Sequence, residues 1–405
     1  MKKTLITISL CCLIIFSGKS QSSSSSTSIT TDDKKGSYTI SINDGLGSLK
    51  IEASGEISFN ETETAIENLS EDGYIRYKKN GKKITAEKGS DGKIYYTYNG
   101  GAKTQALNEE GNKFLMDAIR VMIEHGVDAK GHVARIYKKG GSAAVLNEFD
   151  NMKSDYVKKM MIEYLMKYDA LSADEMTSIA NKVGKQMSSD YEKAGLLSQF
   201  SGKYLSNPAT AAAYLRAVKT IGSDYEKANA LKTIFKQPLN DEMFAQVTDI
   251  ANSVGSDYEK AGILEDIISN GSLNDTKFSA VIAAAKSIGS DYEKANVLEM
   301  IFSKSDIPQN HFTETIAAVA SIGSDYEKSS VLQKLAGRKI VSEANWISII
   351  QAAQNIGSDY EKANTLQAIA GNMPKTENVK SAFKVAAKTI SSEYEYGKLV
   401  KSVDL

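Results

Sequence analysis

Gly222-Ser-Asp-Tyr-Glu-Lys227 decides the fold, because the same six residues return at Gly255, Gly289, Gly323 and Gly357. Looser copies lie at Ser154-Asp-Tyr156, Ser189-Asp-Tyr-Glu-Lys193 and Ser392-Glu-Tyr-Glu395. A period of this length, repeated so regularly, predicts an array of stacked structural repeats. The aligned tyrosines, which are 33 to 35 residues apart, are Tyr156, Tyr191, Tyr225, Tyr258, Tyr292, Tyr326, Tyr360 and Tyr394.

Each residue of the string suits a tight junction between two helices. Glycine favours the left-handed conformation that follows a helix C-terminus. Serine caps the next helix, and the glutamate three positions later completes a capping box. Aspartate in the first turn interacts favourably with the helix dipole. We assign this structural role to Gly222, Ser223, Tyr225, Glu226, Gly255, Ser256, Tyr258, Glu259, Gly289, Ser290, Tyr292, Glu293, Gly323, Ser324, Tyr326, Glu327, Gly357, Ser358, Tyr360 and Glu361.

The segments beside each string have helical periodicity. Apolar residues recur at helical spacing after the tyrosine, as at Ala261, Leu264 and Ile267, and a large aromatic such as Phe278 precedes the next glycine. One helical hairpin cannot bury its apolar face alone, so neighbouring hairpins must cover it. We therefore predict a right-handed α-solenoid of about seven to eight 34-residue repeats over residues 108–405.

The repeated tyrosine has two readings. It could be a wedge between stacked helices, where a ring buries a large area, and we favour this interpretation. Alternatively, the tyrosines could form a ladder along one surface and bind an extended partner, since tyrosine is common at binding surfaces.

Residues 37–107 have the pattern of β-strands. Asn80-Gly81 separates two alternating segments, which is a strong signal for a tight hairpin. We predict a small antiparallel β-meander domain, and hence an α+β fold for the chain. Its aromatic residues favour cross-strand packing, although they could also form a platform that binds a glycan or peptide. These candidate partner-binding residues are Tyr74, Tyr77, Tyr95, Tyr96 and Tyr98.

Residues 1–20 have the layout of a secretory signal peptide: a basic start, an apolar run from Leu5 to Phe16, and small residues up to Ser20. We expect cleavage after Ser20 and a periplasmic, cell-surface or extracellular location; an uncleaved anchor is the alternative. Both cysteines, Cys11 and Cys12, lie in this peptide, so the mature chain would have no disulfide. Residues 21–36 are rich in Ser and Thr and predict a disordered linker.

The composition leaves little material for catalysis. The 405 residues include 49 Lys+Arg and 50 Asp+Glu, and this balance argues against a nucleic-acid-binding protein. His125, His132 and His311 lie in no metal-binding or catalytic motif. An active site needs one constellation rather than eight copies, so we expect no enzyme activity, metal or cofactor. An enzyme with an unrecognised site between Tyr137 and Asp155 is an alternative.

Two resemblances bear on function. The 34-residue hairpin resembles tetratricopeptide and HEAT-like solenoids; a capping box between Gly222 and Tyr225 and the missing Ala-x3-Phe pattern favour HEAT-like packing. The β segment from Gly73-Tyr74, together with Ala134-Arg135-Ile136, Ala144-Val145-Leu146 and Ser154-Asp-Tyr-Val-Lys158, resembles exported regions fused to some bacterial β-lactam-sensor-type membrane metallopeptidases. The peptidase part and its zinc motif are absent, so this resemblance implies a sensory or partner-binding module without protease activity.

These observations predict an exported, non-enzymatic scaffold or binding protein. Its helical-repeat surface would bind a protein or peptide partner in the cell envelope, with no membrane span in the mature chain. A glycan- or cell-wall-binding protein that uses the aromatic face of the β domain is one alternative, and a sensory or regulatory module is another.

Overall fold

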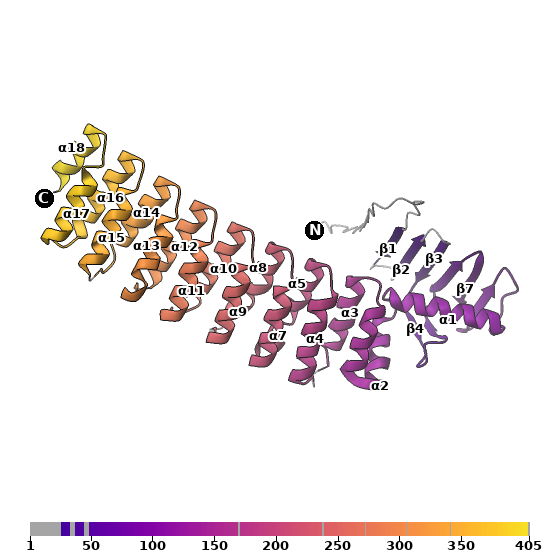
Figure 1. Cartoon of the computed structure of the whole chain (residues 1–405). Helices are drawn as coiled ribbons and strands as arrows, with labels where there is room; N and C mark the ends of the chain where they lie inside the picture. Colours follow the sequence, from indigo (N-terminus) through magenta and orange to yellow (C-terminus); the bar gives the residue numbers. More distant parts are fainter. Residues whose placement is uncertain are drawn as a thin grey trace, which may run out of the picture. The chain divides into compact units, whose positions relative to one another are not determined.

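A computed structural model describes residues 26–32, 37–43, 48–168, 171–236, 239–271, 273–305, 307–340 and 342–403 (Figure 1). The predicted signal peptide lies outside these ranges. The chain divides into two compact units, Met1–Glu175 and Met176–Leu405. Within the described ranges, no helix combines the length and the apolar character needed to cross a membrane.

The first unit contains a six-stranded antiparallel sheet, which confirms the predicted meander. The Asn80-Gly81 turn between β6 and β7 has positive φ at both residues, 49° and 80°, as a tight hairpin requires. A separate pair, β4 (Ile57–Phe59) and β5 (Ile66–Leu69), lies between β3 and β6 in the chain. In sheet order the six strands are β1 (Ser26–Asp32), β2 (Ser37–Asn43), β3 (Ser48–Ser54), β6 (Tyr74–Lys79), β7 (Lys82–Lys88) and β8 (Ile94–Tyr98).

Strand β1 corrects the prediction that residues 21–36 are a disordered linker. It pairs with β2 along its whole length, with Ser26 opposite Asn43 and Asp32 opposite Ser37. The alternating β-branched residues of this segment, Thr27, Ile29 and Thr31, favour a strand over a helix. The rest of the predicted linker lies outside the described residues.

Helix α1 (Glu109–Glu124) begins after its N-cap Asn108, the residue at which the sequence period changes. It packs on the sheet through Phe114, whose ring centroid lies 4.9 Å from that of the fully buried Tyr77. The Tyr77 hydroxyl donates a 2.6 Å hydrogen bond to Asp117 Oδ2. The helical segment from residue 108 to 175 lies in the same compact unit as the sheet. It continues with α2 (Ala129–Glu148), η1 (Phe149–Asn151) and α3 (Asp155–Leu165).

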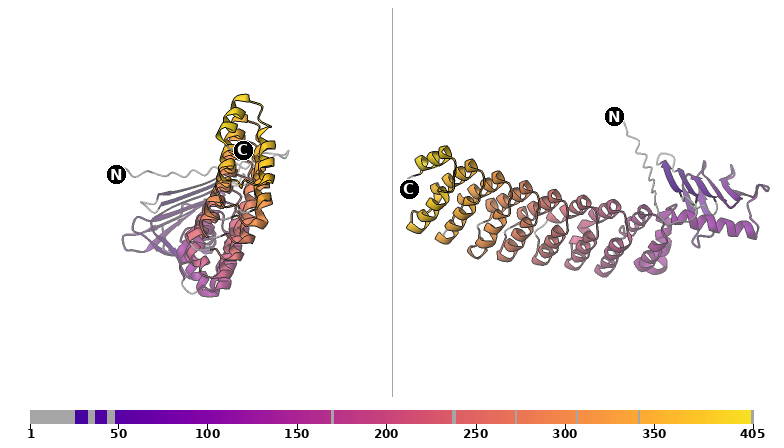
Figure 2. Two further views of the ribbon diagram at one scale, coloured as in Figure 1. Left: turned by 90° about the vertical axis from the view of Figure 1, so that its left-hand side faces the viewer. Right: turned by 45° about the horizontal axis from the view of Figure 1, so that its top comes forward.

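The second unit is built from two rows of parallel-stacked helices, in which α10 contacts α8 and α12, and α15 contacts α13 and α17 (Figures 1 and 2). This arrangement confirms the helical solenoid. The helices that begin at the repeated string are α5 (Asp190–Gln199), α8 (Asp224–Lys232), α10 (Asp257–Ser269), α12 (Asp291–Lys304), α14 (Asp325–Ala336), α16 (Asp359–Asn372) and α18 (Glu393–Ser402). The second row comprises α4 (Ala173–Gln186), α7 (Pro208–Lys219), α9 (Asp241–Asn252), α11 (Asp275–Lys286), α13 (Phe312–Ala320), α15 (Glu343–Gln354) and α17 (Glu377–Ala387). Short helices α6 (Ser201–Leu205), η2 (Ile234–Lys236) and η3 (Gln309–His311) lie in the connections.

The core of the second unit lies between the two rows. The large aromatic residue of each repeat is buried there, as in Phe244, Phe278, Phe312 and Trp346. Burial of such side chains and of the neighbouring Leu and Ile residues supplies the main stabilising term of each repeat. Trp346 is the one tryptophan in the sequence, so its fluorescence reports on this unit.

The repeated glycines do not have the left-handed conformation that the sequence predicted. Positive φ angles occur at six other glycines among the described residues, but at none of the string glycines. Close approach explains their recurrence instead. A Cβ atom built on Gly289 would lie 2.9 Å from Oδ2 of Asp257 in the preceding repeat, and the corresponding distance at Gly323 is 3.0 Å.

Replacing Gly289 with alanine should destabilise the second unit by about 1 kcal/mol, because the added methyl displaces a hydrogen-bonded carboxylate. Gly262 is the matched control: it lies inside α10, and a Cβ there would meet nothing within 4 Å. We expect Gly262→Ala to stabilise the unit by up to about 1 kcal/mol. Urea unfolding followed by Trp346 fluorescence compares the two variants. Equal stabilisation by both would refute the close-approach argument.

Candidate binding surface

The aspartate of each string ties its repeat to the next one. Asp257 Oδ1 accepts a 2.9 Å hydrogen bond from the Gly289 N–H, and its Oδ2 accepts a 2.7 Å hydrogen bond from the Ser290 N–H. These backbone groups belong to the following string, so the carboxylate joins two successive junctions. Asp190, Asp291 and Asp325 make the same contact, whereas Asp224 and Asp359 accept from both corresponding N–H groups with Oδ2 alone, those of Ser391 and Ser392 in the case of Asp359.

The serine of each string caps its helix as predicted. Ser256 Oγ, for example, accepts a 3.3 Å hydrogen bond from the Glu259 N–H. The predicted capping box is only half formed. In a full box the glutamate would accept a hydrogen bond from the serine N–H, but here that N–H donates to the aspartate of the preceding repeat. The glutamate side chains are therefore not needed for the cap.

The lysines of the six strings from Lys193 to Lys362 are buried, and several of them also donate a hydrogen bond to the next repeat. Lys294 Nζ donates a 3.1 Å hydrogen bond to the Ser321 carbonyl, and Lys362 Nζ donates a 3.2 Å hydrogen bond to the Thr389 carbonyl. These carbonyls lie at helix C-termini, where the helix dipole favours a positive charge. Lysine and aspartate thus both act within the junctions.

The tyrosines are exposed, so the favoured interpretation as wedges is wrong. Those of the second unit are 55 to 76% exposed. Each is the second residue of its helix, and the space between stacked helices is filled by smaller residues such as Ala261 and Leu264. Because the helices are equivalent, the rings recur once per repeat along one edge of the solenoid. We call this set the tyrosine row: Tyr191, Tyr225, Tyr258, Tyr292, Tyr326, Tyr360 and Tyr394.

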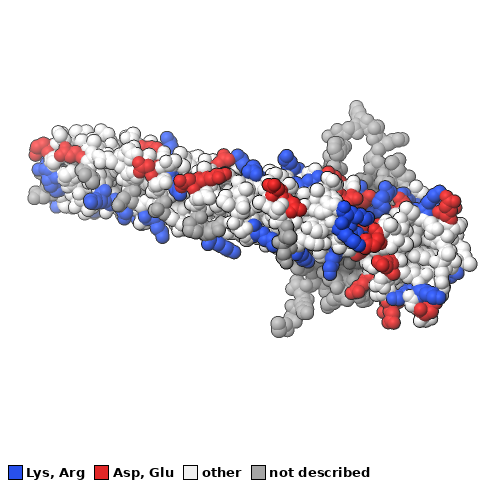
Figure 3. Space-filling view, turned by 90° about the horizontal axis from the view of Figure 1, so that it is seen from below, with Lys and Arg blue, Asp and Glu red and all other residues white. Residues whose placement is uncertain are grey.

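Carboxylates accompany the tyrosine row. Within the described part of the chain, the string glutamates from Glu226 to Glu361 form no ion pair. Each string contains one Asp and one Glu but only one Lys, so each junction carries excess negative charge. Burial raises the pKa of Glu327, and the nearby Glu299 and Asp291 raise it further. Burial, then Glu293 and Asp266, likewise raises the pKa of Glu265. On the face drawn in Figure 3, acidic and basic side chains are interspersed.

The tyrosines of the β domain do not form one platform. Tyr95 and Tyr96 are adjacent in β8 and therefore point to opposite faces of the sheet. Tyr77 and Tyr96 are buried, and the Tyr98 ring lies 5.7 Å from Phe114, so these three face α1. The ring contacts of Tyr77 and Tyr98 are with Phe114 of α1, so these rings pack between the sheet and the helix. Tyr74 lies on the other face, where the Arg76 guanidinium is 4.4 Å from its ring centroid.

A buried polar cluster holds the β4–β5 hairpin on α2. Arg135 donates to Glu63 Oε1, Asp128 Oδ2 and the Phe59 carbonyl at 2.9 to 3.1 Å, and His132 Nδ1 lies 2.7 Å from Glu63 Oε1. Burial alone would raise the pKa of Glu63, but the hydrogen bonds and charges of His132 and Arg135 outweigh it and lower that pKa. Every carboxylate here is already bound, and the cluster contains no nucleophile. Its arrangement is that of a structural clamp.

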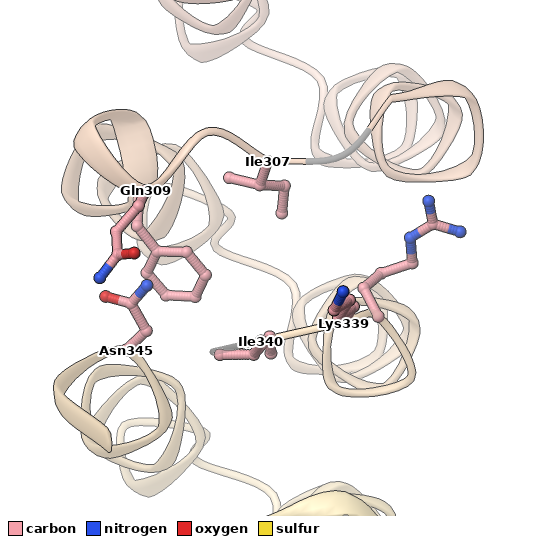
Figure 4. Close-up of a pocket in the computed structure, with 7 residues that line it drawn as sticks. Ile307, Gln309, Lys339, Ile340 and Asn345 are labelled. Carbon is pink, nitrogen blue, oxygen red and sulfur yellow. The ribbon is translucent and has the colours of Figure 1, made fainter. Parts of the chain in front are cut away.

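The second unit also has a small hollow between the loops of two adjacent repeats (Figure 4). Ile307, Gln309, Phe312, Lys339 and Ile340 are among its lining residues. Its volume of about 40 Å³ is far below the ~300 Å³ at which small-molecule sites begin. In the described ranges, no three His, Cys, Asp or Glu side chains gather closely enough to hold a metal ion.

The second unit is thus a helical solenoid that presents one aromatic side chain per repeat, an architecture typical of extended binding surfaces. No protein-family model, curated protein or solved structure matches the chain.

Proposed function

We propose that the protein is an exported, non-enzymatic scaffold whose helical-repeat surface binds a protein or peptide partner in the cell envelope. The observation that carries this proposal is the tyrosine row. Glycine, serine, aspartate and lysine each act in the repeat junction, whereas the tyrosines from Tyr191 to Tyr326 are exposed and, among the described residues, make no hydrogen bond there. A large ring that is maintained at the surface without a structural task is best explained by binding.

Two finer features belong to the same proposal, and a glycan-binding role of the β domain is its alternative. Export rests on the signal-peptide layout of residues 1–20. HEAT-like packing of the hairpins rests on the short capped junction, which a continuing tetratricopeptide helix would not have. A glycan-binding role for the β domain is less well supported, because its five candidate tyrosines are divided between two faces of the sheet.

Replacing Tyr225, Tyr258, Tyr292 and Tyr326 together with alanine should weaken partner binding at least about tenfold, because aromatic anchors dominate such interfaces. The test exposes the chain from residue 21 onward to a displayed peptide library and to solubilised envelope proteins, and then measures the affinity of the selected ligand. Val385→Ser is the matched control, since Val385 is an exposed apolar residue on α17, away from the row. Equal affinity of all three proteins would exclude the tyrosine row as the binding surface.

A further inference from the structure

In the last repeat, the ammonium group of a lysine lies over the ring of one tyrosine of the tyrosine row. Lys398 of α18 places its Nζ 5.5 Å from the ring centroid of Tyr360 on the neighbouring helix α16. The same Nζ lies 3.9 Å from Oε2 of Glu395, the glutamate of its own string. A cation over a tyrosine face is attracted by the negative π-face of the ring at this distance. Ring and carboxylate together therefore make one small cation site.

The earlier repeats keep the ring and the carboxylate but lack the lysine. Lys398 follows its string tyrosine by four residues, and this position holds a short, uncharged residue in the other six repeats of the unit. None of these side chains can carry an ammonium to the preceding ring. They are Gly195, Asn229, Gly262, Asn296, Ser330 and Asn364.

We propose that the tyrosine row binds an extended peptide segment whose Lys or Arg side chains occupy, in successive repeats, the place that Lys398 takes over Tyr360. Each site would consist of a ring from one repeat and the string glutamate of the next, as in Tyr258 with Glu293 and Tyr292 with Glu327. This inference rests on the proposed binding function and specifies the chemistry of the partner.

Charge and spacing both favour this occupant. The string glutamates from Glu226 to Glu361 bring negative charge to the row and form no ion pair in the described part of the chain, and the carboxylates of Glu299 and Asp291 add to that charge near Glu327. Stacked helices are ~8–10 Å apart. A polyproline II segment advances about 9.3 Å in three residues, so a cation at every third position matches one repeat.

The experiment uses the chain from residue 21 onward and a 21-residue peptide in which Pro-Pro-Lys is repeated seven times. We expect it to bind at least about tenfold more tightly than Pro-Pro-Gln or Pro-Pro-Glu peptides of the same length, with an affinity that falls as salt rises. A peptide with fourteen prolines followed by seven lysines has the same composition but the wrong spacing. It should bind several-fold more weakly, because fewer sites are engaged at once.

Variants identify the groups that bind. Joint replacement of Tyr258, Tyr292 and Tyr326 with phenylalanine keeps the rings and should preserve affinity within about twofold, whereas alanine at the same positions should lose at least about tenfold. Asn296→Lys with Ser330→Lys fills two sites internally and should compete with the peptide. The control pair Ala283→Lys with Ala344→Lys adds the same charge at exposed positions of the second helix row. Trp346 fluorescence verifies that each variant is folded.

The outcomes separate this inference from the broader proposal. If a library-selected ligand depends on the tyrosine row but contains no Lys or Arg, and the Pro-Pro-Lys and Pro-Pro-Gln peptides bind equally, the cationic partner is ruled out while the binding function stands. If neither a selected ligand nor the Pro-Pro-Lys peptide depends on the row, both proposals fail. Equal effects of the two lysine pairs would also contradict the ring sites.

Discussion

Replacing Arg135 with alanine should destabilise the first unit by about 3–5 kcal/mol, because it leaves buried carboxylates without their counter-ion. Its guanidinium binds Glu63, Asp128 and the Phe59 carbonyl at once, and only 10% of the side chain is exposed. Hydrogen-exchange mass spectrometry of residues 48–168 measures the loss, which should be largest in the β4–β5 hairpin. Arg76→Ala is the matched control: Arg76 is 45% exposed and pairs with Glu52 at 3.8 Å, so its loss should cost less than about 1 kcal/mol.

The acid response of the same cluster provides an independent check. Because the folded-state pKa of Glu63 is lowered, its contribution to stability is present above the unfolded-state pKa and is lost as the pH falls through the folded-state pKa. In the Arg135→Ala variant, the stability lost on acidification through Glu63 should be smaller than in the wild type, because the guanidinium no longer lowers the pKa of Glu63. Arg135 would not be the centre of the clamp if the stability of the Arg135→Ala variant depended on pH as in the wild type. The same would follow if Arg135→Ala destabilised the unit no more than Arg76→Ala does.

The helical architecture could be predicted because its information is local and repeated. The junction serines and the buried aromatics such as Phe278 follow from helix capping and helical spacing within one repeat. The aspartate contact could not be derived in this way, since Asp257 and Ser290 are 33 residues apart and meet only through stacking. Their joint recurrence in every string was the available signal. Sequence alone predicts the glycine from backbone conformation, whereas in the structure it recurs because the aspartate carboxylate of the preceding repeat lies close to it.

The exposure of the tyrosines could have been recognised from spacing alone. In α8, buried positions include Ala228 and Leu231, while Tyr225, Asn229 and Lys232 are separated by four and three residues and form the polar stripe of the helix. The size of the ring favours a buried wedge, but its position on the polar stripe of the helix decides its exposure. Spacing also separates the β-domain tyrosines, because Tyr95 and Tyr96 are consecutive in a strand and cannot lie on the same face of the sheet.

The sheet could be predicted from the sequence, whereas the clamp around Arg135 could not. Alternation and the Asn80-Gly81 turn predict the meander directly. The Ser/Thr content of strand β1 is also typical of disordered segments, so composition does not predict this strand, although it contains the β-branched residues Thr27, Ile29 and Thr31. The clamp joins Glu63 to Arg135 across 72 residues, and no local pattern indicates such a contact.

The inter-repeat contact should make Asp257→Ala the most damaging surface-charge substitution in the second unit, with an expected loss of about 2–3 kcal/mol. The carboxylate accepts hydrogen bonds from two backbone N–H groups of the next junction, and alanine leaves both without that acceptor. In a solenoid each repeat contacts only its neighbours, so a weakened interface lowers the cooperativity between the segments on either side. Urea unfolding monitored by Trp346 fluorescence and by circular dichroism should therefore give two separated transitions in the variant and coincident ones in the wild type.

Two comparisons test whether this loss comes from the hydrogen bonds. Asp257→Asn retains one acceptor oxygen and should lose about half as much as alanine. Asp249→Ala removes a 61% exposed aspartate whose partner is Lys219, and should change stability by less than about 1 kcal/mol. Combining Asp257→Ala with Gly289→Ala should cost less than the two separate losses together, because the methyl group added by the second substitution no longer meets a carboxylate. If the losses in stability were strictly additive, and Asp249→Ala destabilised the unit as much as Asp257→Ala, the aspartate would act through general charge. It would then not act through the junction of the next repeat.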